Sequence, residues 1–409
     1  MKDVAEFFIQ NADAHNSILL ETAGNTSIAV LSSAGKLTRQ EGITTFTPFT
    51  DKGHAVADFL AEKFAVSRET LPMVFPQSDG GNIITALQNE GHFLAGTFHF
   101  SYSEDLPDFE FFLAEEHLRI EGDISADIAK PGPATATANK TDAEFARDVE
   151  KLQQHIADGE IRQVVPSRTF TVECPEPYQA YQRIRHNNPS PYMFFVRGED
   201  YTLLGGSPES SLKFDAVTRD ITINPIAGTR PRGQTGEEDT RFERELRTDP
   251  KEISEHTMLI DVATQDLEKI ADNVHVTNLM NVERYSRVMH LVSSVTGTLH
   301  NSLSAADAYR ACMNMGTVSG APKKRATQFL AEIEQSPRGP FGGAVGYFAP
   351  DGSFDSCIVI RSAYVRNGIA SVSAGAGVVK ESEPQAEADE TFFKARAVLE
   401  AIADVEVIR

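Results

Sequence analysis

The stretch from Ala374 to Lys394, AGAGVVKESEPQAEADETFFK, constrains this chain most because it joins two chemically different halves. In the first half, Gly375 and Gly377 leave the backbone bare, so main-chain amides can approach an anionic ligand closely. Pro384 then marks the start of a helix with an acidic first turn. At the spacing i, i+3 and i+7, one face of this helix carries Glu387, Glu390 and Lys394.

These carboxylates have two interpretations if the stretch is taken alone. Two carboxylates one turn apart suit a hard divalent cation such as magnesium, and a lysine one turn further on can pair with a carboxylate that the cation does not fully neutralise. Acidic residues near a helix N-terminus also complement the helix dipole and solvate the exposed face. The remaining sequence has to decide between the two.

Charge and cysteine content exclude several classes of protein. A formal net charge of −21 over 409 residues argues against nucleic acid and anionic membranes as partners, since both require a basic surface. Cys174, Cys312 and Cys357 are odd in number and far apart, which argues against a disulfide framework and a CxxC metal site. The start, MKDVAEFFIQ, lacks the features of a signal peptide, and no run of about 18 apolar residues occurs. We expect a cytoplasmic protein that does not bind membranes.

The chain is predicted to divide into two parts. Residues 129–141, AKPGPATATANKT, are rich in Pro, Ala, Thr and Gly, which predicts an exposed connector. We expect an N-terminal lobe over residues 1–128 and a second domain over residues 141–409, where Thr141 and Glu144 form a capping box at a helix start. In the first part, β-like and helical runs lie at Ser27–Ser32, Phe109–Leu113 and His54–Phe64.

Candidate functional residues gather in the second part. Glu160–Phe170 is predicted as one strand, with Gln163 on the face opposite Arg168. The sequence GGSPE ends in Glu209, a carboxylate held at a turn by a glycine pair and a proline. PIAGTRPR at Pro225–Arg232 predicts a strand, and the GQTGEED that follows predicts an exposed, mobile loop of the kind used as a lid.

A long helix is predicted over Asp249–Ala271. Glu252 and Glu255 share one side of it, and most of its other positions are apolar. Because an unpaired buried carboxylate is costly, these two glutamates need a partner. We expect that partner to be the cation proposed for Glu387 and Glu390.

Several longer segments resemble the large subunit of anthranilate synthase, component I, within the chorismate-utilising enzymes. They include ERYSRVMHLVSSVTGTL, AYRACMNMGTVSGAPKKRA, FGGAVGYF, DSCIVIRSAYV, QVVPSR, NPSPYMFF, SPESSLK, PIAGTRPRG and AGAGVVKESEPQAEADETFFKARAVLEAI. The resemblance runs from about Thr141 to Ile402, whereas residues 1–128 match only through LLET and DLPDFEFFLAE. It implies an α+β fold of two packed antiparallel sheets with helices outside, and an active site in the cleft between the sheets.

The same resemblance implies residue roles. The family substrate is chorismate, whose ring carboxylate is bridged to acidic side chains by magnesium. Glu255 and Glu390 match the principal metal carboxylates, with Glu252 and Glu387 in support. Glu209 matches the general acid that protonates the C4 hydroxyl so that it leaves as water. Substrate-contacting groups are matched by Tyr347, Arg361, Lys394, Thr317 and the amides of Gly375 and Gly377.

Gln163 indicates which nucleophile attacks. Family members that add water carry a lysine here, because the attacking water must lose a proton and an amine can accept it. An amide side chain cannot act as this base. Gln163 therefore favours ammonia, attacking at C2, although an exposed polar position on a strand is the simpler explanation of this residue. Para-aminating relatives form a covalent intermediate through a lysine at the position of Ala227, so this residue argues against that reaction.

Two products are open to an ammonia-using member. His290 matches a family histidine implicated in expelling pyruvate, although a lone histidine among apolar neighbours also suits a protein core. We expect magnesium-dependent conversion of chorismate to anthranilate and pyruvate through 2-amino-2-deoxyisochorismate. The alternatives are a synthase that stops at this intermediate in a specialised pathway, or another chorismate-utilising synthase such as an isochorismate synthase.

The resemblance also bears on partners and control. No segment resembles a glutamine amidotransferase, so free ammonia or a separate glutaminase subunit must supply the nitrogen. The resemblance implies an effector site for tryptophan at Glu21, Thr22, Pro189, Tyr192 and Met193. Because the segment after LLET is contracted, we expect weakened tryptophan control. VATQDL in place of LARNDL is a further departure that could mark a specialised or even non-enzymatic paralogue, although the matched acids argue against the latter.

Overall fold

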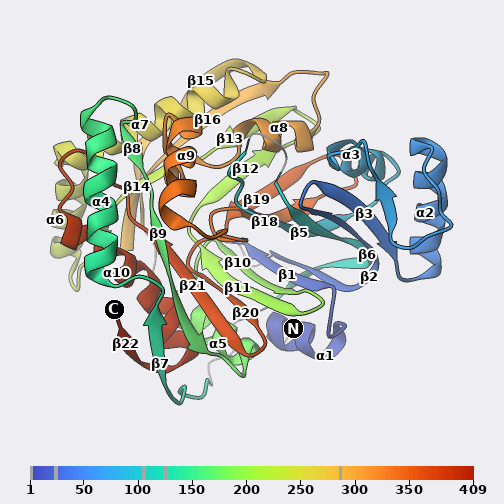
Figure 1. Ribbon diagram of the computed structural model, residues 1–409, viewed down its shortest axis with the longest axis horizontal. Helices are drawn as coiled ribbons and strands as arrows, with labels where there is room; N and C mark the ends of the chain where they lie inside the picture. Colours follow the sequence, from blue (N-terminus) through green and yellow to red (C-terminus); the bar gives the residue numbers. More distant parts are fainter. Residues whose placement is uncertain (1–2, 23–25, 104–106, 123–127, 285–287) are drawn as a thin grey trace.

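The computed structural model describes residues 3–22, 26–103, 107–122, 128–284 and 288–409. Within these ranges the strands form a large hydrogen-bonded sheet that doubles back into two packed layers, with helices mainly on the outside (Figure 1). The predicted α+β class is therefore confirmed. The two predicted sheets are two layers of one connected network.

The first layer combines strands from both ends of the chain. In hydrogen-bonded order its strands are β22 (Asp404–Ile408), β7 (Pro133–Ala138), β9 (Ser167–Glu173), β21 (Ile369–Gly375), β20 (Ser362–Arg366), β11 (Tyr201–Ser207), β10 (Tyr192–Arg197) and β1 (Ser17–Thr22). Neighbours are antiparallel except β22 and β7, which are parallel.

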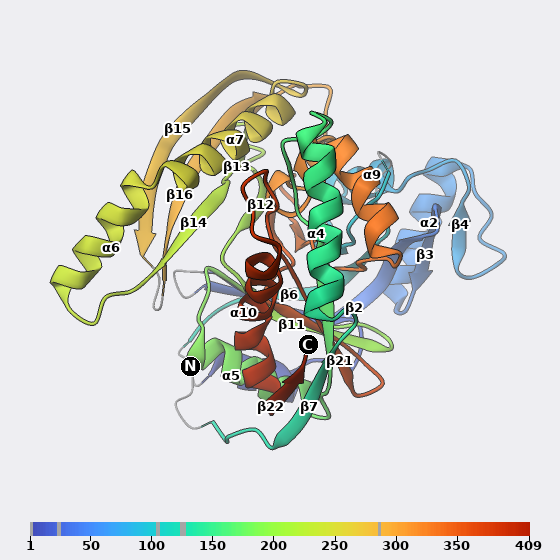
Figure 2. The same ribbon diagram turned by 60° about the vertical axis from the view of Figure 1, so that its left-hand side comes forward.

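The second layer holds the remaining long strands. They are β4 (Met73–Phe75), β3 (Ile43–Pro48), β5 (Leu94–Phe98), β18 (Ala344–Phe348), β19 (Phe354–Ile358), β12 (Ser210–Phe214), β13 (Asp220–Ile223), β16 (Val288–Leu299), β14 (Ile226–Pro231) and β15 (Ala271–Arg284). Both β14 and β15 pair with β16 and extend away from the body of the molecule together with helix α6 (Gly236–Thr248) (Figure 2).

Two long strands, β2 (Thr26–Gln40) and β6 (Phe109–Glu121), belong to both layers. The first residues of β2 pair with β1 and its last residues pair with β3, while β6 follows β2 along both halves. Register shifts between Val30 and Gly35 bend the pair at the point where it changes layer. Apolar side chains from β1, β2, β5, β6, β10, β11, β18 and β19 fill the space between the layers.

Helices cover the outer faces. Their bounds are α1 (Val4–Asn11), α2 (Asp51–Phe64), α3 (Gly81–Asn89), α4 (Asp142–Ala157), α5 (Pro177–Asn187), α6 (Gly236–Thr248), α7 (Pro250–Leu267), α8 (Ala305–Cys312), α9 (Lys323–Glu334) and α10 (Pro384–Ile402), with a short 3₁₀ turn, η1 (Gly316–Val318). The predicted capping box of Thr141 and Glu144 is present at the start of α4. None of the described helices has both the length and the apolar character needed to span a membrane.

Three local predictions are wrong. The supposed connector contains β7, whose alternating Ala and Thr residues pair with β22 and β9. The supposed mobile loop GQTGEED opens helix α6, because Thr235 caps its N-terminus through the amide of Glu238. The predicted strand over Glu160–Phe170 is interrupted at Val165 and Pro166, which separates β8 (Gln163–Val164) from β9.

The predicted division into two domains stays a prediction. Strands from residues 1–128 pair directly with strands of the second part, as β1 does with β10 and β5 with β18. Hydrogen bonding is therefore continuous across the predicted boundary.

Candidate active site

The candidate site is built where the chain passes between the two layers. Glu209 lies where the chain passes from β11 of the first layer to β12 of the second. Arg361 lies where the chain returns from β19 of the second layer to β20 of the first. The crossings touch, since the Ile358 amide donates to the Glu209 carbonyl and the Gly206 amide to the Arg361 carbonyl. A side chain at Gly205 would come within 2.6 Å of Ser362, so only glycine permits this approach.

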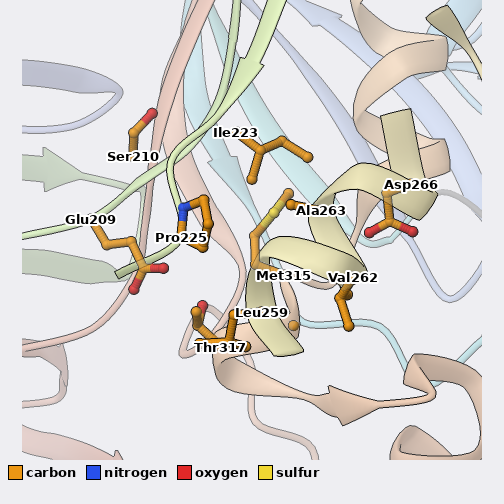
Figure 3. Close-up of a pocket in the computed structure, with 11 residues that line it drawn as sticks. Glu209, Ser210, Ile223, Pro225, Leu259, Val262, Ala263, Asp266, Met315 and Thr317 are labelled. Atoms are coloured by element: carbon orange, nitrogen blue, oxygen red, sulfur yellow. The ribbon is translucent and has the colours of Figure 1, made fainter. Parts of the chain in front are cut away.

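Glu209 is a buried carboxyl with few compensating groups. Its residue is 6% exposed, and burial raises the pKa of the side chain to about 8, against the opposing effects of the Thr317 hydroxyl and the Ile226 amide. It borders a cavity of about 20 Å³, room for about one water. Figure 3 shows the Glu209 carboxylate and Thr317 together at one end of this cavity, with Asp266 at the other. Glu209 is thus placed to hold a proton near neutral pH.

His290 and Arg361 line a second cavity, of about 140 Å³, that also touches Pro208 beside Glu209. The His290 Nδ1 lies 2.9 Å from the Gly228 carbonyl oxygen and 3.1 Å from the Thr229 hydroxyl. Burial lowers the pKa of His290, which favours the neutral ring, and the Gly228 contact opposes this effect. The structure therefore brings His290, Arg361 and Glu209 to neighbouring cavities.

Gln163 is buried, with 5% exposure, so the simpler explanation of an exposed strand position is excluded. Its strand β8 pairs with β17 (Gly320–Ala321) beyond Thr317. Its amide nitrogen lies 2.9 Å from where a Cβ on Gly377 would stand, so Gly377 leaves room for the Gln163 side chain in this position. The amide oxygen, Oε1, is buried and accepts no hydrogen bond among the described residues. Such an oxygen can accept a hydrogen bond from a ligand.

Helices α7 and α10 bring the four predicted metal carboxylates into one electrostatic cluster. Burial raises the pKa of Glu255 to about 7, and the charges of Glu252, Glu390 and Glu387 add to this rise. Burial also raises the pKa of Glu387, with Glu390 contributing. Among the described residues, Glu255 Oε1 and Glu387 Oε2 are buried and accept no hydrogen bond. Two buried oxygens without donors on neighbouring helices fit a divalent cation.

The other two carboxylates already have partners. Glu252 Oε1 accepts from Arg230 at 2.9 Å, and Glu390 Oε1 accepts from Lys394 at 2.6 Å. Lys394 also donates to the Gly375 carbonyl at 3.0 Å, which joins α10 to the end of β21. As they stand, no three His, Cys, Asp or Glu side chains of the described part of the chain are close enough to hold a metal ion.

Sequence interpretation missed one cation in this cluster. The Lys251 Nζ lies 3.7 Å from Glu255 Oε1, and the charges of all four glutamates raise its pKa against the effect of burial. The signal was present in the sequence, because Lys251 precedes Glu255 by one helical turn.

Tyr347 is not brought to this site. Its ring stacks on Phe93 at 5.5 Å among the apolar side chains between the layers, and burial raises its pKa to about 12. It pairs along β18 with Asp355, the acceptor of a hydrogen bond from Tyr192. Tyr347 therefore shares its surroundings with a residue of the predicted effector set.

The effector residues themselves come together only in part. Glu21 and Thr22 of β1 pair with Met193 and Tyr192 of β10, respectively. Pro189 instead lines the cavity of His290 and Arg361. The Glu21 carboxylate is already bound by Arg185 at 2.7 Å and by the Tyr181 hydroxyl.

Comparison with known proteins assigns the chain to a family. Residues 98–400 match the family described as chorismate binding enzyme, and the chain belongs to that family. Among curated proteins it is similar to anthranilate synthase component 1 of Escherichia coli strain K12, with 59% identity over 273 residues, 65% of this chain and 52% of that protein. The Vibrio cholerae protein of the same name is 55% identical over 274 residues. The chain spans about half the length of the curated relatives it matches.

Solved structures extend the similarity over nearly the whole chain. Anthranilate synthase component I of Streptococcus pneumoniae superposes with a TM-score of 0.72 and 28% identity, covering 92% of this chain and 93% of that one. A Bacillus anthracis protein described as a putative 2,3-dihydroxybenzoate-specific isochorismate synthase reaches a TM-score of 0.75 at 21% identity, covering 97% and 99%. At that identity the second likeness concerns the fold alone.

Proposed function

We propose that this chain converts chorismate and ammonia to anthranilate and pyruvate through 2-amino-2-deoxyisochorismate. The observation that carries the proposal is the buried Glu209, whose pKa of about 8 keeps it protonated at neutral pH beside Arg361, His290 and the acidic helices. The identity of 59% to an anthranilate synthase component 1 supports the choice of substrate.

In the amination step, Glu209 donates its proton to the C4 hydroxyl of chorismate. The bond from C4 to oxygen breaks and water leaves, while nitrogen bonds to C2 and the ring double bonds shift. The unpartnered Oε1 of Gln163 accepts a hydrogen bond from ammonia and points the nitrogen lone pair at C2. Ammonia needs no base before it attacks, which is why an amide side chain suffices.

Arg361, Lys394 and the glycine segment hold the substrate. Arg361 and Lys394 lie close together, since Arg361 donates to the Lys394 carbonyl at 3.2 Å. Two cations at one end of the site match a substrate with two carboxylates. When the substrate binds, the Lys394 ammonium gives up part of its ion pair with Glu390 and binds a substrate carboxylate instead.

Glu255 and Glu387, supported by Glu252 and Glu390, would hold magnesium. When bound, the cation supplies charge neutralisation and polarisation of the ring carboxylate. Glu255 Oε1 and Glu387 Oε2 accept no hydrogen bond among the described residues, and the ion pair of Glu255 Oε1 with Lys251 is long at 3.7 Å, so these two residues have the most coordinating capacity to offer. The Lys251 ammonium, 3.7 Å from Glu255 Oε1, would compete with the cation for that carboxylate.

In the elimination step, the C2 proton leaves and the C3 to oxygen bond breaks, which releases pyruvate and an aromatic ring. Burial lowers the pKa of His290, and its contact with the Gly228 carbonyl fixes the ring orientation. A neutral, oriented imidazole can accept the C2 proton or organise the group that does. Nitrogen reaches the site as free ammonia or from a separate glutamine amidotransferase subunit.

The test is product analysis with chorismate, ammonium and magnesium. We expect the native protein to release anthranilate, and His290→Met to consume chorismate while accumulating the aminated, non-aromatic intermediate, with elimination about 10²- to 10⁴-fold slower. A native protein that stops at the intermediate would make it a 2-amino-2-deoxyisochorismate synthase. Formation of isochorismate would refute the role of Gln163, and no consumption of chorismate would refute the proposal as a whole.

A further inference from the structure

Arg338 lies just after helix α9 and joins two backbone segments of the site. Its Nη2 donates to the Val165 carbonyl at 2.6 Å, and its Nη1 donates to the Val318 carbonyl at 2.7 Å. Its guanidinium lies 4.3 Å from the centre of the Phe100 ring, and its side chain is 2% exposed. One side chain thus ties two loops together in a buried setting.

Glu334 completes this contact from the last residue of α9. It accepts two hydrogen bonds from Arg338, at 2.6 and 2.8 Å, and a third from the Tyr102 hydroxyl at 2.9 Å. It also accepts from both the amide and the hydroxyl of Ser167 at 2.8 Å. Arg338 and these donors hold the pKa of Glu334 below its usual value although burial opposes this. The carboxylate is therefore charged and fully bonded.

The two carbonyls that Arg338 holds belong to the segments that present the reacting groups. Val165 is two residues from Gln163, at the break between β8 and β9, and Ser167 begins β9 on the far side of that break. Val318 directly follows Thr317 in η1. Main-chain hydrogen bonds also join these segments, since β8 pairs with β17 and the Val165 amide donates to the Ser319 carbonyl at 3.0 Å. The Arg338 guanidinium adds a side-chain link between the carbonyls of Val165 and Val318, close to Gln163 and Thr317.

We propose that Arg338 and Glu334 act as a positioning pair that sets the placement of Gln163 relative to Thr317 and Glu209. This inference rests on the proposed function, because its consequence is the orientation of ammonia against the ring. No direct contact joins the pair to Arg361 or Lys394 among the described residues, and these two bond to each other and to Glu390 and Gly375. The pair reaches Gly375 indirectly, through Ser167, which pairs with Gly375 across β9 and β21. Loss of the pair should therefore affect the use of ammonia more than the binding of chorismate.

A planar guanidinium is required for this arrangement. Its three nitrogens reach the two carbonyls and both carboxylate oxygens at once, in directions fixed by the fork. A lysine ammonium is a single point and cannot bond both carbonyls and both carboxylate oxygens at once. Arg338→Lys keeps the charge near Glu334 and so separates geometry from electrostatics.

The experiment compares the native protein, Arg338→Lys, Arg338→Ala and the control Arg366→Ala, which removes an exposed arginine bound to Asp200. We expect Arg338→Lys to lower the rate at saturating chorismate about 10- to 100-fold and to raise the KM for ammonium, with the KM for chorismate near native. Added guanidinium at millimolar concentration should partly restore Arg338→Ala. Arg366→Ala should match the native protein.

A second measurement, amide hydrogen exchange, does not depend on turnover. In Arg338→Lys, exchange should speed up in residues 163–168 and 316–320 and stay native elsewhere. If the native protein fails to consume chorismate, the proposed function is wrong, and hydrogen exchange alone decides whether the pair positions these segments. Native kinetics in Arg338→Lys would overturn the inference. A parallel loss of chorismate binding, rate and melting temperature without guanidinium rescue would do the same, because that pattern indicates a structural role alone.

Discussion

Two groups of buried carboxylates in this protein respond to burial in opposite ways. Glu334 receives hydrogen bonds from Arg338, Ser167 and Tyr102, and its pKa is held below the usual value. Glu209 and Glu255 lack comparable donors, and burial raises their pKa values to about 8 and about 7. Burial alone therefore does not decide protonation. The number of donors that the surrounding fold supplies decides it.

The difference separates structural from reactive carboxylates. Both oxygens of the charged Glu334 carboxylate accept hydrogen bonds, so the protein itself offsets the cost of desolvating it. Glu334 thus joins β9 to α9 without needing a ligand. Glu209, Glu255 and Glu387 carry a desolvation cost that their protein partners offset only in part, and a proton or a cation relieves the rest. We expect a substitution of Glu334 to act through the segments that it and Arg338 position, and substitutions in the second group to lower activity directly.

The largest expected effect concerns Glu209. Glu209→Gln keeps the shape of the side chain but has no acidic proton to donate, so chorismate consumption with ammonium should fall about 10²- to 10⁴-fold. The melting temperature should not fall, because no charged partner is lost. A spectrophotometric assay of chorismate and a thermal melt measure both quantities. Near-native turnover would show that Glu209 is not the proton donor.

Next in size is a stability effect at Glu21. Its carboxylate binds Arg185 and the Tyr181 hydroxyl, and Arg185 also binds Asp3 at the start of α1. Glu21→Gln should lower the free energy of unfolding by about 3 kcal/mol, because Arg185 stays buried without one of its two carboxylates. Urea unfolding measures this change.

The control for Glu21 is Glu6→Gln, at an exposed position on α1, which should leave the free energy of unfolding unchanged.

We further expect micromolar tryptophan to change the rate of neither the native protein nor Glu21→Gln, since the Glu21 carboxylate is already engaged. Strong inhibition of the native protein by micromolar tryptophan would show that the contracted N-terminal segment still forms an effector site.

A smaller effect is expected for cation affinity at Glu255. Glu255→Gln removes a carboxylate oxygen that has no donor, so the affinity for magnesium or manganese should fall about 10- to 100-fold. Stabilisation by added cation, measured as the shift of the melting temperature, reports affinity without turnover. Glu268→Gln, an exposed position at the end of α7, is the matched control. Equal shifts in all three proteins would place the cation elsewhere.

Periodicity in the sequence predicted the parts of the site that lie on helices. The spacing of Glu252 and Glu255, and of Glu387 and Glu390, follows from 3.6 residues per turn, and α7 and α10 begin at Pro250 and Pro384. The start of α10 was therefore predicted correctly. The end of α7 was not, because Ala271 opens β15.

Features that depend on the meeting of distant segments could not be predicted in this way. The donors around Glu334 come from residues 102, 167 and 338, so no local pattern distinguishes it from Glu209. Pro133–Ala138 has the composition of a linker, yet pairing with β22 and β9 makes it a strand. The position of Tyr347 between the layers depends in the same way on its packing against Phe93.

A pH dependence of stability due to Glu209 is the effect expected to develop most gradually. In the folded protein its pKa is about 8, above the ordinary value of an unfolded glutamate. Below that ordinary value both states are protonated, so the stability that comes from keeping Glu209 neutral is fully present. As the pH rises toward 8, the unfolded chain releases the proton while the folded protein retains it, so stability falls by about 1.4 kcal/mol per pH unit. Above about pH 8 the fall levels off.

Glu209→Gln removes this contribution and leaves Glu255 and Glu387 as they are, so the difference between the two proteins isolates Glu209. Denaturant unfolding from pH 5 to pH 9 should show the native protein losing stability relative to the variant, with the difference becoming constant above about pH 8. Parallel curves would mean that Glu209 ionises normally. In that case the contrast with Glu334 would fail at the residue on which the proposed chemistry depends.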